Sequence, residues 1–259
     1  MILALISAAL PSLAMAAAWR VRMRTGNSGW IDAIWSAGTG AAGLIAALSA
    51  PAGGRRFLAA GLIALWSLRL AGHIALRARR APDDPRYAAL AREWGSAFPQ
   101  RLFVFLQIQA AAALPLAAAV GMAARAPRPF PDVFDALALA IALIGILGEG
   151  LADAQLRAFR RTAPKGAICE TGLWRMSRHP NYFFEFVFWC GWPVMAFGWP
   201  TGAIAVAAPA LIYLLLNHAS GVPPLERSMR ASRGAAFDAY AARVNRFFPG
   251  PPRDGARGR

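Results

Sequence analysis

The stretch Gly172-Leu-Trp-Arg-Met-Ser-Arg-His-Pro-Asn-Tyr-Phe-Phe-Glu-Phe-Val-Phe-Trp189 joins a basic, polar loop directly to an apolar segment. Proline is well suited to the first turn of a helix, so Pro180 predicts that a helix begins there. Asn181, Tyr182 and Glu185 follow closely. We therefore expect an apolar helix that carries one acid, Glu185, just inside the environment that the helix enters.

Long apolar segments recur throughout the chain. Of its 259 residues 57% are hydrophobic, and several stretches contain few or no charges. About twenty apolar residues suffice to cross the ~30 Å hydrocarbon core of a bilayer. The pattern predicts an all-α fold, a polytopic membrane helix bundle of about seven transmembrane helices, at residues 2–19, 30–50, 57–76, 102–123, 133–156, 181–198 and 201–219.

The 28 Lys and Arg residues indicate how such a bundle would be oriented. If the N-terminus is outside, 23 of them fall in segments that face the cytoplasm and 4 in segments on the opposite side. Basic residues favour the cytoplasmic side, so this asymmetry predicts an outside N-terminus, a cytoplasmic C-terminus and an odd number of crossings, five or seven. We expect a multi-pass protein of the plasma membrane, the inner membrane of a bacterium.

The first apolar segment allows a second interpretation, a cleaved signal peptide. Leu13-Ala-Met-Ala-Ala is similar to a small-residue cleavage site. However, Arg20, Arg22 and Arg24 follow the apolar run, and no basic residue precedes it. This order favours a retained first helix.

The net charge of +15 bears on the partners of the protein. Its basic residues are interleaved with apolar runs and do not form a polar module, which favours membrane lipids and phosphate-bearing cofactors over nucleic acid. Cys169 and Cys190 lack the spacing of metal ligands. We expect neither a disulfide nor a metal site.

The segment Gly38-Thr-Gly-Ala-Ala-Gly43 matches the dinucleotide-binding fingerprint letter by letter. That fingerprint binds a cofactor only between a strand and the start of a helix, whereas this copy lies within an apolar run. We interpret it as a small-residue surface for close helix packing.

Two predicted spans carry polar groups on one face. Asp32 begins a stripe in the second span that we expect to face the bundle interior, although an acid at a helix end beside headgroup water would fit equally. In the third span Arg69 and His73 share a face. They can act in catalysis, or Arg69 can form a structural ion pair with Asp32 or Glu149.

The fifth span changes from acidic to basic as it ends. Glu149, Asp153, Arg157 and Arg160 recur at helical spacing, so they share one face. A solvated, ion-paired helix end would explain the arginines. It does not explain Glu149 and Asp153, which lie too close to the apolar core.

Helices outside the membrane are expected in two places. The loop over residues 77–101 predicts a short helix along the membrane surface, and an amphipathic stretch follows residue 220. Residues 1–249 are expected to form a single transmembrane domain with a cofactor-binding half at about 133–249. Residues 250–259 are rich in Pro, Gly and Arg and are expected to be a disordered tail.

Four segments in order resemble a bacterial integral-membrane family related to the steroid 5-alpha-reductases: Ala152-Asp-Ala-Gln-Leu-Arg-Ala-Phe-Arg160, Gly172-Leu-Trp-Arg, Ser177-Arg-His-Pro-Asn-Tyr-Phe-Phe-Glu185 with Trp189, and Ser220-Gly-Val-Pro-Pro-Leu-Glu226. The resemblance implies a membrane-embedded reductase that transfers hydride from NADPH to an activated carbon–carbon double bond of a lipid or steroid-like substrate. It implies a cofactor site formed by Asp153, Arg160, Trp174, Arg178, His179, Asn181, Tyr182, Glu185 and Trp189.

The chain departs from this family in two places. The steroid reductases use a glutamate of the second helix and a tyrosine of the third near the substrate carbonyl, whereas this chain offers Asp32 and no tyrosine in the third span. We expect Asp32, Arg69 and His73 to take the catalytic role. Phe184 stands where relatives commonly have glycine.

Two other functions remain open. Membrane methyltransferases of the isoprenylcysteine or phospholipid type share an Arg-His-Pro-x-Tyr loop and use S-adenosylmethionine, but they usually carry a Glu-Glu pair where Glu226 stands alone. The other alternative is a non-catalytic scaffold or a transporter. A transporter would predict inverted repeats, which the sequence lacks.

Overall fold

A computed structural model describes residues 2–79, 83–164 and 166–253. Within these ranges the chain is helical and contains no strand, as the sequence predicts. The long helices are α1 (Ile2–Thr25), α2 (Gly29–Leu48), α3 (Gly54–Ala78), α5 (Phe98–Ala124), α6 (Val133–Thr162) and α7 (Pro180–Met195). Shorter elements are α4 (Pro85–Trp94), η1 (Gly95–Ala97), η2 (Gly172–Arg175), η3 (Gly202–Val206), α8 (Ala207–Leu214), η4 (Leu215–Ala219), α9 (Val222–Arg233) and α10 (Ala235–Arg243).

Five helical segments of the described chain are long and apolar enough to cross a membrane. They are Gly29–Leu48, Gly54–Ala78, Pro85–Ala124, Val133–Thr162 and Gly202–Arg233. The two other predicted spans coincide with α1 and α7. Because α7 has 16 residues, its regular part is shorter than the roughly twenty residues of a typical span.

The chain divides into two compact units, which we describe separately. The first comprises Met1–Leu139 and Trp192–Ala208, and the second comprises Ala140–Gly191 and Pro209–Arg259. Every residue expected to be catalytic belongs to the first unit. Every residue expected to hold the cofactor belongs to the second.

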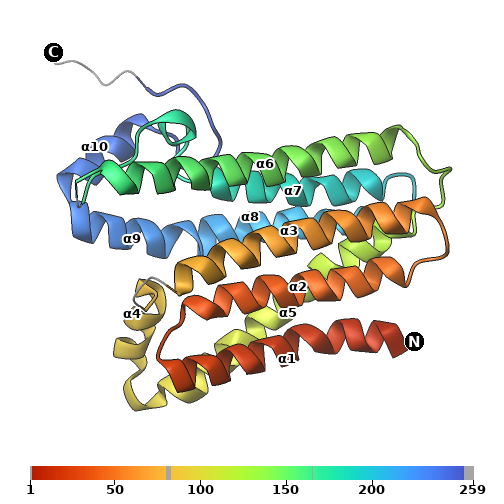
Figure 1. The fold of residues 1–259 in the computed structure, drawn as a ribbon, viewed down its shortest axis with the longest axis horizontal. Coiled ribbons are helices and arrows are strands. Elements are labelled where there is room, and N and C mark those ends of the chain that lie inside the picture. Colours follow the sequence, from red (N-terminus) through yellow and green to blue (C-terminus); the bar gives the residue numbers. More distant parts are fainter. Residues whose placement is uncertain (1, 80–82, 165, 254–259) are drawn as a thin grey trace. The chain divides into compact units, whose positions relative to one another are not determined.

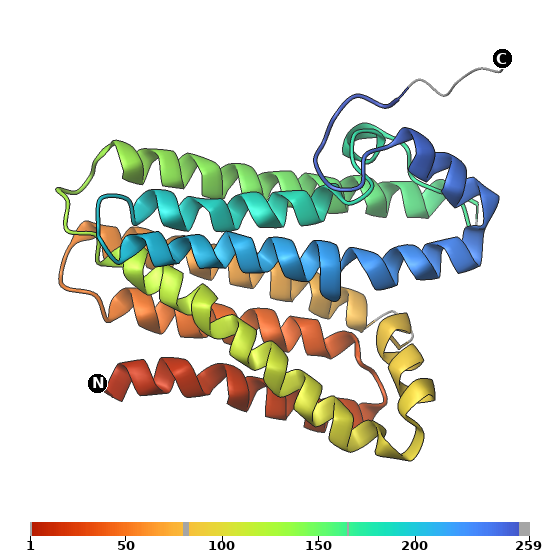
Figure 2. The ribbon, with the colours of Figure 1, turned by 180° about the vertical axis from the view of Figure 1, so that it is seen from behind.

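Close helix contacts hold the first unit together. There α2 packs against α1, α3 and α5, and α5 crosses α1 and α2 obliquely (Figures 1 and 2). A Cβ atom added to Gly40 would lie 2.2 Å from the side chain of Ser67 on α3, and one added to Gly38 would lie 2.7 Å from Ala14 on α1. The glycine motif of α2 is therefore a packing surface, as its position in an apolar run predicted.

In the second unit α6 and α7 also meet through glycine. A Cβ atom on Gly145 would lie 2.6 Å from the backbone nitrogen of Phe188, and one on Gly148 would lie 2.3 Å from the ring of Phe184. Gly148 thus leaves the space that the Phe184 ring fills. This contact explains how the chain accommodates the large side chain of Phe184.

The short helices of the loops also form where the sequence predicts them. Pro85 opens α4, and the Asp84 carboxylate accepts a hydrogen bond from the backbone nitrogen of Arg86 at 3.0 Å. The tail contains α9 and α10, and residues 250–253 have no regular structure. The expected disorder of residues 254–259 lies outside the described residues.

Candidate functional site

Polar groups on α6 and α7 come together in the second unit. Pro180 opens α7, which confirms the predicted helix start. At the next residue, the Asn181 amide donates to the Asp153 carboxylate of α6 at 3.4 Å. Asp153 is only 6% exposed. The two helices therefore place a buried acid beside an amide, although the two residues are 28 positions apart in the sequence.

Glu185 continues this polar face one turn deeper into α7. Its side chain is 7% exposed, and its Oε1 accepts a hydrogen bond of 2.8 Å from the indole nitrogen of the fully buried Trp189. A buried carboxylate is costly to maintain without hydrogen-bond donors. Trp189 supplies one such donor.

Arg160 lies seven residues beyond Asp153 on α6 and is exposed. Two helical turns separate these residues, about 10 Å along the helix axis, and they share a face. A ligand that reaches from the buried acid to the guanidinium would have to be extended. It would also need an anionic group at its exposed end.

The arginine and histidine of the preceding loop contact the C-terminal segment. Arg178 Nε and His179 Nε2 both hydrogen-bond to Oε1 of Glu226 on α9, at 2.7 and 3.0 Å. Arg178 also donates to the backbone oxygens of Ala241 and Val244, at 3.0 and 2.8 Å. Both side chains thus anchor the loop to the C-terminal segment, and their contact with a phosphate or ribose stays a prediction.

Burial decides the charge of His179. The imidazole is 2% exposed, and burial lowers its pKa below the usual value of about 6.5, while the hydrogen bond to Glu226 opposes the shift without cancelling it. His179 is therefore neutral at pH 7. Its Nε2 then carries the proton and donates to the carboxylate.

Further contacts fix the same loop. Trp174 is buried and donates its indole proton to the backbone oxygen of Ala152 at 2.9 Å, which also makes it a structural residue. The hydroxyl of Ser177 donates to Phe247 O at 2.7 Å. These contacts join η2 to α6 and to the end of the chain. No spacing pattern indicates these contacts, because the two residues of each pair are 22 and 70 positions apart in the sequence.

The residues expected to be catalytic lie in the first unit. Asp32, in the first turn of α2, forms an ion pair with Arg86 of α4, which also pairs with Asp84 at 2.9 Å. Asp32 therefore sits at a helix end, partly exposed, which agrees with the simpler of its two interpretations. Arg69 and His73 are half-buried on α3, four residues apart as predicted.

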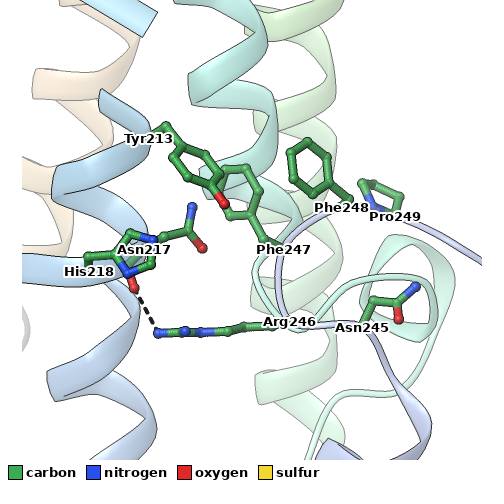
Figure 3. Close-up of a pocket in the computed structure, with 8 residues that line it drawn as sticks. All are labelled: Tyr213, Asn217, His218, Asn245, Arg246, Phe247, Phe248 and Pro249. Atoms are coloured by element: carbon green, nitrogen blue, oxygen red, sulfur yellow. Dashed lines mark hydrogen bonds between the residues drawn. The ribbon is translucent and has the colours of Figure 1, made fainter. Parts of the chain in front are cut away.

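A pocket that the sequence did not indicate opens in the second unit (Figure 3). Its volume is about 430 Å³. Aromatic side chains meet an amide, an imidazole and a guanidinium around it. The lining residues are Tyr213, Asn217, His218, Asn245, Arg246, Phe247, Phe248 and Pro249.

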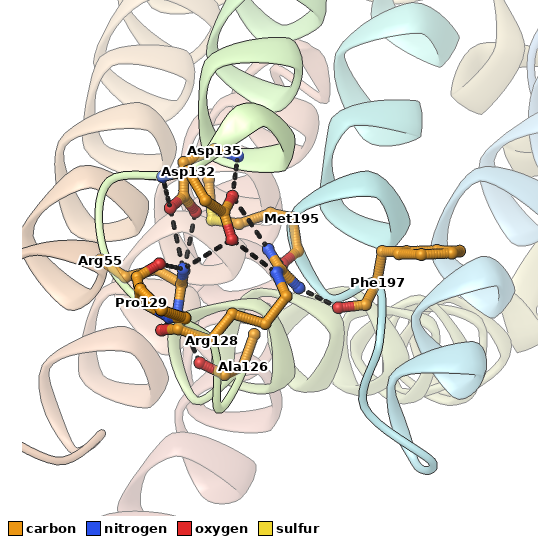
Figure 4. Close-up of polar contacts among 8 residues, drawn as sticks. All are labelled: Arg55, Ala126, Arg128, Pro129, Asp132, Asp135, Met195 and Phe197. Carbon is orange, nitrogen blue, oxygen red and sulfur yellow. Dashed lines mark hydrogen bonds and ion pairs between the residues drawn. The ribbon is translucent and has the colours of Figure 1, made fainter.

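A cluster of charges in the first unit is fully engaged in joining elements (Figure 4). Arg55 at the start of α3 is buried and donates to both carboxylate oxygens of Asp135, at 2.7 and 2.8 Å. Arg128 pairs with Asp132 at 2.6 Å and donates to the backbone oxygens of Met195 and Phe197. We interpret this cluster as structural.

Residues 18–244 match the model of a family described as proteins of unknown function (DUF1295). The chain belongs to this family. No curated protein and no solved structure matches it. Because the matched region contains both units nearly whole, membership applies to the entire helical assembly and to the α6–α7 polar face within it.

Proposed function

We propose that the protein is a membrane-embedded, NADPH-dependent reductase that transfers hydride to an activated carbon–carbon double bond of a lipid or steroid-like substrate. The observation that carries this proposal is the buried polar face of α6 and α7. Two carboxylates, Asp153 and Glu185, lie on it beside the Asn181 amide, each less than a tenth exposed.

The chemistry of these groups suits a dinucleotide. Buried carboxylates accept hydrogen bonds from ribose hydroxyls and from the carboxamide nitrogen of nicotinamide, and an amide both donates and accepts. The exposed guanidinium of Arg160 suits a phosphate group. NADPH supplies a hydride, and the protein binds the cofactor and orients it. Tyr182 and Trp189 complete the proposed cofactor face.

The similarity of these segments to relatives of the steroid 5-alpha-reductases supports the same function. Arg178, His179 and Trp174 act through the loop in this proposal, as positioning residues for Asn181 and Tyr182. Asp32, Arg69 and His73 remain the proposed catalytic residues, with Arg69 and His73 as hydrogen-bond donors toward the substrate. A carbonyl oxygen that gains charge during hydride addition needs such a donor.

The proposed setting is a plasma membrane crossed seven times, with the N-terminus outside. The apolar helices support a membrane location, and the excess of basic residues in alternate loops supports this orientation. A lipid substrate would then enter from the bilayer. NADPH would reach the basic end of α6 from the cytoplasm.

Thermal unfolding of the detergent-purified protein with different ligands tests the proposal. A ligand at about 100 times its Kd stabilises a protein by about 2.7 kcal/mol, enough to raise the unfolding temperature measurably. We expect NADPH to raise it and S-adenosylmethionine to have no effect. An increase with S-adenosylmethionine alone would favour a methyltransferase, and no response to either would favour a scaffold or transporter.

A further inference from the structure

The pocket between η4 and the C-terminal segment contains two buried donors that lack an acceptor (Figure 3). Within the described part of the chain, neither Nδ2 of Asn217 nor Nε of Arg246 has a hydrogen-bond partner. Asn217 is only 3% exposed. Leaving buried donors unsatisfied is unfavourable, so the pocket favours a ligand with acceptor oxygens.

The backbone is arranged to present these donors. Leu215–Ala219 is a π-helical turn, in which the backbone nitrogen of Ser220 donates to Leu215 O at 2.9 Å. Such turns are rare and often occur at functional sites. The turn carries Asn217, whose backbone oxygen accepts a 2.8 Å hydrogen bond from Arg246. The guanidinium is thus fixed to the turn that carries Asn217.

The charge of the pocket favours an anion. Arg246 contributes a permanent positive charge, and none of the eight described residues that line the pocket is acidic. A guanidinium and an amide donor together suit a phosphate or a carboxylate. The pocket volume of about 430 Å³ is larger than a small ion requires and is typical of pockets that bind organic ligands.

The rim of the pocket is aromatic, which distinguishes a lipid from a soluble anion. Phe248 is 53% exposed, and its ring stacks with Tyr213 at a centroid distance of 6.2 Å. Exposed aromatic side chains beside a cation are typical of the membrane–water interface, where rings contact acyl chains and basic groups contact headgroups. The pocket therefore matches an amphipathic ligand.

This pocket is separate from the proposed cofactor face. Phe183 and Phe186 of α7 contact Phe247, which lines the pocket. Asn181 is instead directed at Asp153 on α6. Helical geometry puts Phe183 about 200° and Phe186 about 140° around the α7 axis from Asn181, so the two groups occupy different faces.

We propose that the pocket binds the phosphate of an anionic phospholipid headgroup, with Asn217 and Arg246 as donors. The full-length protein in detergent would be titrated with phosphatidylglycerol, with diacylglycerol of the same chains, and with inorganic phosphate, following the unfolding temperature. We expect phosphatidylglycerol alone to stabilise the protein. Arg246→Gln and the isosteric Asn217→Asp should weaken its apparent affinity about tenfold or more.

Arg243→Gln is the matched control, because Arg243 carries the same charge three residues away and pairs with the half-exposed Glu170. It should retain the affinity for phosphatidylglycerol. Equal stabilisation by diacylglycerol or by inorganic phosphate would overturn the proposal, as would unchanged affinity in either pocket variant that folds. Loss of the NADPH response in Arg246→Gln would overturn it too, because the pocket would then belong to the cofactor site.

Discussion

Glu226 is the side chain on which the loop before α7 depends. Its carboxylate oxygen accepts from both Arg178 and His179, and the Arg178–Glu226 pair is largely buried, with the two side chains 11% and 13% exposed. A buried charge that loses its partner destabilises a protein far more than an exposed one does. The position of Asn181 and Tyr182, which follow this loop, therefore depends on a residue more than forty positions away.

Replacing Glu226 with Ala should lower the stability of the detergent-solubilised protein by about 3 kcal/mol, because Arg178 would remain buried without its carboxylate. Glu170→Ala is the matched control. It removes an equally short ion pair, to Arg243, whose side chains are 40% and 41% exposed, and should change stability by about 0–1 kcal/mol. Similar losses in the two variants, measured by thermal unfolding, would contradict the anchoring role.

The pH dependence of stability should reveal the buried imidazole of His179. Its folded pKa lies below the unfolded value of about 6.5, so below pH 6.5 the unfolded state binds more protons and stability falls. The loss can reach about 1.4 kcal/mol per pH unit until the folded pKa is passed. This decline in stability would be measured from the unfolding temperatures of the wild type and of His179→Gln between pH 8 and about 5.

Gln can keep a donor near the position of Nε2 but does not titrate, so His179→Gln should lack this decline. An unchanged decline in His179→Gln would assign the effect to other groups.

The sequence predicted the helix positions of some of these residues but not the contact partners of others. Pro180, Asn181 and Glu185 were placed correctly because helical spacing is local. The partners of Arg178 and His179 were missed because they depend on how α9 folds back onto the loop, which no local pattern records. Arg178 is paired within the protein, and its expected contact with a phosphate stays a prediction.

At the scale of helices, the contact between α6 and α7 depends on Gly145 and Gly148. Their missing side chains allow the polar face of Asp153 to approach that of Asn181. The sequence revealed both helices and the faces they expose through periodicity and Pro180. It did not reveal that Phe184 packs on Gly148, because that contact is a match of shapes between distant positions.

Gly145→Ala should destabilise the protein by about 1–3 kcal/mol, since the new methyl group would lie 2.6 Å from the backbone of Phe188 and the helices would have to separate. Gly61→Ala on α3 is the control. No atom lies within 4 Å of its added Cβ in the described structure, and alanine favours a helix, so stability should be unchanged or rise by up to about 1 kcal/mol. Equal thermal stability of the two variants would contradict tight α6–α7 packing.

At the scale of the whole molecule, composition and charge predicted a helical membrane protein correctly. Hydropathy is a sum over many residues and tolerates local errors, which is why the five apolar helical segments were found. Two of them, Pro85–Ala124 and Gly202–Arg233, extend well beyond the predicted residues 102–123 and 201–219. The division into two units was not predicted, because each of α6 and α7 contributes to both units.

Reporter fusions test the predicted topology. Alkaline phosphatase, which is active only outside the cytoplasm, should be active when fused after Ala126 in the loop between α5 and α6 and inactive when fused after Arg253. Green fluorescent protein should give the opposite result. Activity of the phosphatase at both sites, or at Arg253 alone, would contradict an outside N-terminus with an odd number of crossings.

The central claim is that the α6–α7 face binds NADPH, and a cofactor titration tests it most directly. NADPH binding to the purified full-length protein would be followed by energy transfer from tryptophan, in the wild type, Asn181→Ala and the matched control Asn245→Ala. We predict saturable binding to the wild type and control and at least tenfold weaker binding to Asn181→Ala, a loss of about 1.4 kcal/mol. No saturable binding to the wild type, or equal affinity in all three proteins, would contradict the account.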